Sequence, residues 1–164
     1  MVLAPSPPLE PSGSTTVGPM RRVQRTAQIS ATPAVVYAFL AEPANLPRWQ
    51  AGIVAAERTS PPPTEVGSTA RVVLELMGQQ VTAEITVSEA ETDRRLALGA
   101  SVAGMGIVAT LDLEPRGGGT EITLSSEVRA ENIFMAPLER MVTETAERDL
   151  DASLARLSAA LTGD

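Results

Sequence analysis

The side chains that could do chemistry in this chain are few, and their types limit what that chemistry can be. Its 164 residues include no His, no Cys and no Lys, because all 13 basic residues are Arg. This composition excludes Ser-His-Asp triads, thiolate nucleophiles, Schiff-base lysines and metal sites built on His or Cys. Carboxylates, hydroxyls, arginines and the single phenol Tyr37 remain. They could support modest acid–base work or oxyanion stabilisation, and neither needs a cofactor or a metal.

Several polar residues of the C-terminal region have two possible roles. The acidic run Glu139, Glu144, Glu147, Asp149 and Asp151 is interpreted as the solvated face of a helix, since metal ligands would have to converge on one point. Thr145 could hydrogen-bond a ligand or the backbone of its own helix.

Arg25 falls on the apolar side of an N-terminal strand. There it either extends to water or pairs with an acid of the last helix, such as Glu144 or Glu147.

The overall charge is acidic, with a formal net charge of −7 and no basic run. This balance argues against nucleic acid or an anionic membrane surface as the partner. No apolar stretch is long enough to span a membrane, so stable membrane insertion is not expected. The first 20 residues lack the features of a signal peptide. We therefore predict a cytoplasmic protein.

The N-terminal half predicts a specific order of elements. A strand over 22–30 precedes Thr32, which is placed to cap a helix whose first residue is Pro33. Pro43 ends this short helix, a second short helical turn runs to Trp49, and a new strand begins near Ile53.

Alternating apolar residues then predict a hairpin of strands 67–77 and 80–90 that turns at Gly78-Gln79 and places Leu76 opposite Val81. The predicted buried face holds Ala70, Val72, Leu74, Leu76, Val81, Ala83, Ile85 and Val87. Further strands are predicted over 95–103, 106–115 and 120–129, which makes seven with the two before the hairpin.

Apolar residues at three- and four-residue steps predict one long helix over about 135–162. We expect a single domain over 21–162, preceded by a disordered tail over 1–20 that is rich in Pro, Ser and Gly.

Four stretches, in this order and spacing, carry a resemblance to a known family. They are Ala31-Thr32-Pro33-Ala34 with Val36 and Phe39, Leu46-Pro47-Arg48-Trp49, Val66-Gly67-Ser68, and the segment from Asp149 to Leu157. The chain resembles the START-like or SRPBCC superfamily, the polyketide cyclase/dehydrase and lipid-transport group. The resemblance implies an α+β helix-grip fold, in which a seven-stranded curved antiparallel sheet wraps around a long C-terminal helix. Two short helices would lie between strands 1 and 2.

The resemblance also implies a cavity between sheet and last helix that accepts an apolar small molecule, but no shared catalytic motif, so the catalytic residues stay unknown. Trp49 could be a hydrophobic plug under the small helices or part of the pocket wall. The full set of candidate ligand-binding residues is Trp49, Leu74, Ile85, Leu98, Ala109, Leu124, Phe134, Leu138, Met141, Val142 and Thr145.

Three functions are consistent with this sequence. The first is binding of an apolar, lipid- or polyketide-like molecule. The second is a cyclase- or dehydratase-like enzyme that acts by positioning its substrate. The third is an interaction module of the chaperone-cofactor kind, which would need a large exposed apolar patch. The oligomeric state is left open.

Overall fold

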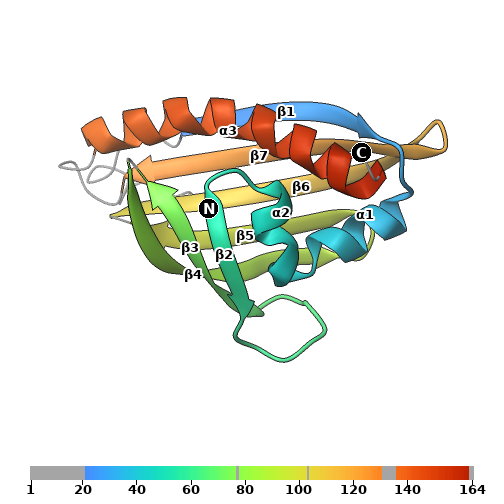
Figure 1. The fold of residues 1–164 in the computed structure, drawn as a ribbon, viewed down its shortest axis with the longest axis horizontal. Helices are drawn as coiled ribbons and strands as arrows, with labels where there is room; N and C mark the ends of the chain where they lie inside the picture. Colours follow the sequence, from blue (N-terminus) through green and yellow to red (C-terminus); the bar gives the residue numbers. More distant parts are fainter. Residues whose placement is uncertain (1–20, 77, 103, 131–135, 163–164) are drawn as a thin grey trace, which may run out of the picture.

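The computed structural model describes residues 21–76, 78–102, 104–130 and 136–162, and the predicted disordered tail lies outside them. The described residues form a seven-stranded curved antiparallel sheet, with the helices on its concave side (Figure 1). The predicted α+β helix-grip architecture is therefore confirmed. Among the described residues, no helix combines the length and the apolar character that crossing a bilayer requires.

The sheet order is β1-β7-β6-β5-β4-β3-β2, so β1 and β2 form its two edges. The strands are β1 (Arg21–Ile29), β2 (Ile53–Arg58), β3 (Thr69–Leu76), β4 (Gln79–Glu91), β5 (Arg95–Val102), β6 (Met105–Arg116) and β7 (Gly119–Ala130). The helical elements are α1 (Pro33–Leu40), the 3-10 turn η2 (Pro43–Asn45), α2 (Leu46–Trp49) and α3 (Ala136–Thr162).

The start of α1 follows from its local sequence. Thr32 has extended backbone angles, and its hydroxyl accepts a hydrogen bond from the Val35 amide. Pro33 occupies the first turn, where its missing N–H costs nothing. Val36, Tyr37 and Leu40 are buried against the sheet. The predicted cap and helix start are confirmed.

The β3–β4 hairpin differs from the prediction in its register. Leu74 pairs with Val81 and Leu76 pairs with Gln79, so the pairing is displaced by two residues from the predicted one of Leu76 with Val81. For the side chains that the structure describes, the buried face is nevertheless the predicted one, because a displacement of two residues does not change the side of the sheet on which a residue lies. Gly78 carries a φ of +80°, a left-handed conformation that favours glycine at the turn.

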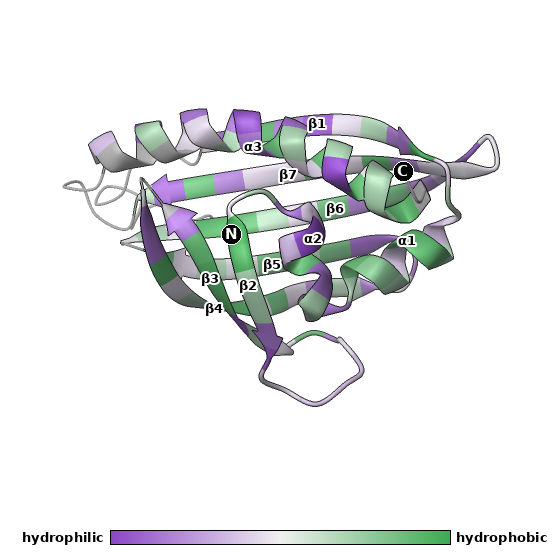
Figure 2. Ribbon diagram, viewed as in Figure 1, coloured by the Kyte–Doolittle hydropathy of each residue, from purple (hydrophilic) through white to green (hydrophobic). Residues whose placement is uncertain are grey.

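The last helix α3 packs against the edge strand β1, its neighbour β7 and the short helix α2. Hydrophilic and hydrophobic segments alternate along its length (Figure 2). Its C-terminal half places Leu150, Leu154 and Leu157 in the main hydrophobic core. The same core contains Trp49 of α2 and the sheet residues Leu96, Leu111, Leu113 and Ile122.

Candidate ligand-binding cavity

A cavity of about 500 Å³ lies between the N-terminal half of α3 and the concave face of the sheet. Its walls come from the loop between α2 and β2, from the start of β2, from β3, β5, β6 and β7, and from α3. Most of the wall is hydrophobic. The hydrophobic lining residues are Ala51, Ile53, Leu74, Ala100, Val102, Ile107, Ala109, Leu124, Val128, Met141, Ala146 and Leu150.

The cavity exists because several of the side chains that face one another here are small, whereas those in the core around Trp49 are large. Ala100 and Ala109 come from neighbouring strands, Ser126 from the next, and Ala146 from the helix above them. Ala109 and Ser126 are directly paired across β6 and β7. With so little side-chain volume available from both sides, the sheet and helix leave space between them.

Met141 indicates that this space is not closed by the helix. Its side chain lines the cavity and is 53% exposed, although a methionine at a core position would be buried. Thr145, one helical turn later, also lines the cavity and is exposed.

The polar part of the wall contains a carboxylate that the sequence interpretation placed elsewhere. Asp149 is half-buried and lines the cavity, whereas we expected it on the solvated face of the helix. Burial raises the pKa of Asp149 above its usual value, against the opposing effect of the nearby cations Arg148 and Arg156. The sequence held a signal for this placement, because Met141, Thr145, Asp149 and Ser153 recur at four-residue steps and so share one side of α3.

Two contacts set the surroundings of Asp149. The Ser153 hydroxyl, which is buried, accepts a hydrogen bond of 2.9 Å from the Ala51 amide and ties α3 to the loop before β2. In that loop Gly52 has a φ of +94°, and a Cβ added there would lie 3.6 Å from Asp149 Oδ2. A Cβ at that distance would make an ordinary van der Waals contact, so it is the left-handed φ of the turn, and not lack of space beside the carboxylate, that favours glycine here.

The predicted candidate residues separate into groups. Leu74, Ala109, Leu124, Met141 and Thr145 line the cavity together. Phe134 lies outside the described residues, and so do the side chains of Leu138 and Val142.

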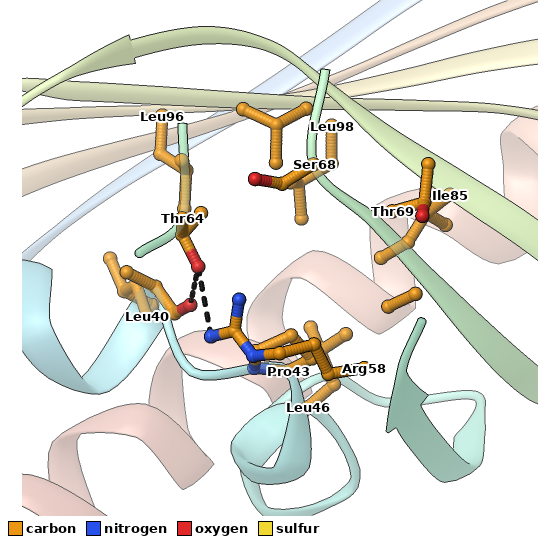
Figure 3. Close-up of a pocket in the computed structure, with 13 residues that line it drawn as sticks. Leu40, Pro43, Leu46, Arg58, Thr64, Ser68, Thr69, Ile85, Leu96 and Leu98 are labelled. Carbon is orange, nitrogen blue, oxygen red and sulfur yellow. Dashed lines mark hydrogen bonds between the residues drawn. The ribbon is translucent and has the colours of Figure 1, made fainter. Parts of the chain in front are cut away.

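Ile85 and Leu98 line a different and smaller pocket, of about 20 Å³, between β3–β5 and the α1–α2 region (Figure 3). A space of this size holds about one water molecule. Arg58 reaches across it and donates a 3.0 Å hydrogen bond from Nη2 to the Thr64 hydroxyl. Thr64 in turn donates to the Ala41 carbonyl at 2.6 Å.

Trp49 is buried at 1% exposure within the main core and lines neither of these two pockets. This placement agrees with the plug interpretation. Tyr37 is buried in the same core, and burial followed by the charge of Asp93 raises its pKa.

Arg25 does pair with an acid of the last helix, but with a different one from those predicted. Its Nε lies 3.2 Å from Asp151 Oδ1, and both side chains are partly exposed. Glu144 instead lines the cavity.

Comparison with known proteins adds a family and a set of similar folds. The family model described as polyketide cyclase / dehydrase and lipid transport matches residues 20–162. No curated protein matches the chain.

Among solved structures, the Zhui aromatase/cyclase from Streptomyces sp. R1128 is 16% identical, with a TM-score of 0.71 over 87% of this chain and 94% of its own. A START superfamily protein from Mycobacterium smegmatis is 14% identical, with a TM-score of 0.71 over 87% of this chain and 97% of its own. The protein TTHA0849 from Thermus thermophilus is 20% identical, with a TM-score of 0.69 over 88% of this chain and 98% of its own. At these identities the structures support the fold.

Proposed function

The chain belongs to the polyketide cyclase/dehydrase and lipid transport family, and from that premise we propose that it binds an apolar small molecule in the cavity under α3. The observation that carries the proposal is the cavity itself, a space of about 500 Å³ with a mainly hydrophobic wall. Small-molecule sites commonly have volumes of roughly 300–1,000 Å³ and a few polar groups that orient the ligand.

Burial of apolar surface is the driving force that this cavity offers. Transfer of apolar surface out of water contributes about 25 cal/mol per Å². Leu74, Ile107 and Leu124 provide the apolar contact from three strands, and the unbranched thioether chain of Met141 can adapt to ligand shape at the opening. A lipid- or polyketide-like molecule suits such a wall better than a compact polar metabolite does.

The test uses N-phenyl-1-naphthylamine, a neutral probe whose fluorescence rises in apolar surroundings. We expect saturable binding to the wild-type chain. Ala109→Phe should abolish that binding, because the added ring occupies the cavity between β6 and α3. Stability should change little, since the ring enters existing space.

The matched control is Thr110→Phe, one residue along the same strand and therefore on the other face of the sheet. It should bind the probe like the wild type. Absence of saturable binding to the wild-type chain, or equal binding to Ala109→Phe, would contradict the proposal.

A second candidate function is catalysis of the cyclase type, and Asp149 is the observation that favours it. A half-buried carboxyl group with a raised pKa, beside an apolar cavity, could transfer a proton to or from a bound carbonyl compound. The experiment is to incubate the protein with a short poly-β-carbonyl compound and follow products by chromatography. Turnover by the wild type and its loss in Asp149→Asn would support the enzyme.

An interaction module finds less support. The large exposed hydrophobic residues among the described ones include Val35 on α1, Val54 on β2, Val66 in the loop before β3, and Met141 on α3. They belong to four separate parts of the chain, and Met141 lines the cavity.

A further inference from the structure

The charged residues that line the cavity are unequal in sign. Among the described lining residues there are three carboxylates, Glu75, Glu144 and Asp149, and one cation, Arg148. With all four ionised, the wall carries two more negative than positive charges. The two glutamates and Arg148 are exposed, while Asp149 lies deeper and is half-buried.

Asp149 differs from the other charged residues of the wall in being half-buried, whereas Glu75, Glu144 and Arg148 are exposed. Among the described residues, its carboxylate receives no hydrogen bond and forms no ion pair within 4.0 Å. The neighbouring polar group Ser153 is already engaged with the Ala51 amide. A half-buried carboxylate without donors is costly, and a ligand group that donates to it would remove that cost.

From this arrangement we infer that the cavity selects amphiphiles with an apolar body and a cationic amine at the polar end, which would contact Asp149. The inference rests on the proposed ligand-binding function and names the chemical class of its ligand. An ammonium group supplies the missing donors and offsets the negative excess of the wall. A carboxylate at the same place would be repelled by the Asp149 carboxylate.

Arg148 is the one lining residue that could instead attract an anion. It is exposed, so water screens its charge, and it follows Glu144 by four residues on the same helix. Arg156, the other cation near Asp149, is also exposed and does not line the cavity. An anionic end group would gain only screened contacts with these two cations and would be repelled by the half-buried Asp149 carboxylate, which is why the amine is favoured.

The contact requires the ionised form of Asp149. The charged groups around it are Arg148, Arg156 and Glu144 on α3 and Glu75 on β3. Since burial raises the pKa of Asp149 above its ordinary 3.8, amine affinity should weaken at a higher pH than an ordinary aspartate would give. The affinity for a neutral ligand should not follow this pH dependence.

The experiment measures displacement of N-phenyl-1-naphthylamine by decylamine, decanol and decanoate, which share one chain length and differ in the end group. At neutral pH, decylamine should bind ~10-fold tighter than decanol, the ratio that one charge-assisted hydrogen bond supplies. Decanoate should bind more weakly than decanol.

Asp149→Asn should reduce the amine preference over decanol to about twofold, since only the screened glutamates remain. The matched control Glu147→Gln removes one negative charge from an exposed position of α3 outside the cavity lining, and it should keep the full preference.

The outcomes separate the two proposals. If neither the probe nor decanol binds saturably, the ligand-binding function itself fails. If decanol binds and decanoate binds as tightly as decylamine or tighter, the function stands and the amine inference is wrong. An amine preference that survives unchanged in Asp149→Asn would likewise overturn the role given to Asp149.

Discussion

The two halves of α3 cover the same sheet, yet one half closes a core and the other covers a cavity. The C-terminal half buries Leu150, Leu154 and Leu157 against large side chains that include Trp49 and Leu111. The N-terminal half leaves Met141 53% exposed above Ala109, Ser126 and other small residues. A single helix therefore stabilises the fold at one end, which we call the packed end, and leaves a binding space at the other, which we call the open end.

Two features together decide where this fold is hollow, namely the volume of the side chains that face one another and the presence of the short helices over the sheet. Two short helices, α1 and α2, fill the packed end with Val36, Leu40, Leu46 and Trp49. The described residues include no corresponding helix over the open end.

Leu157→Ala should cause the largest loss of stability. Leu157 is 0% exposed in the core, and removing its side chain should lower the free energy of unfolding by about 2–5 kcal/mol. Urea denaturation followed by far-UV circular dichroism would measure it. A loss below about 1 kcal/mol would mean that the packed end is not packed as described.

Met141→Ala makes a comparable truncation on the same helix but at the open end. We expect a change in the free energy of unfolding of about 0.5 kcal/mol or less, because the side chain faces the cavity and solvent. The same denaturation experiment compares the two variants directly. Equal losses for Leu157→Ala and Met141→Ala would remove the contrast between the ends.

Asp149→Asn should raise stability at neutral pH by a still smaller amount. Burial raises the pKa of Asp149 in the folded chain, so its contribution to stability is present below the unfolded pKa and is lost as pH rises through the folded pKa. The variant should therefore melt higher than the wild type at neutral pH and equally at a pH below 3.8. Lower stability of the variant at neutral pH would show that Arg148 and Arg156 outweigh the effect of burial.

Removal of divalent metal ions by a chelator should not change ligand binding at the open end. The carboxylates Glu75, Glu144 and Asp149 line the cavity, but among the described residues no group of three or more His, Cys, Asp or Glu is arranged to hold a metal ion. The affinity for N-phenyl-1-naphthylamine should be the same with and without EDTA. Loss of binding in EDTA that a divalent metal restores would make the open end a metal site.

Much of the fold could be predicted from local patterns. Thr32 and Pro33 mark the start of α1 because capping depends on neighbours along the chain. The buried face of β3 and β4 follows from alternation of side chains. Alternation has a period of two, however, and so it cannot distinguish the observed register from one displaced by two residues.

The candidate site was predictable only in part, because the face of the sheet on which a residue lies does not determine which element packs over that residue. Leu74 and Leu98 both occupy predicted apolar positions, yet Leu74 lines the large cavity and Leu98 the small pocket under α1 and α2.

Patterns along the chain were therefore enough to predict the order of elements, the buried face of the β3–β4 hairpin and the apolar stripe of α3. They did not predict that Asp149 enters the cavity wall, that Trp49 fills the core, or that Arg25 pairs with Asp151. The physical reason is that periodicity arises within one element. Cavity volume and the burial of a charge depend on which side chains of several distant elements meet.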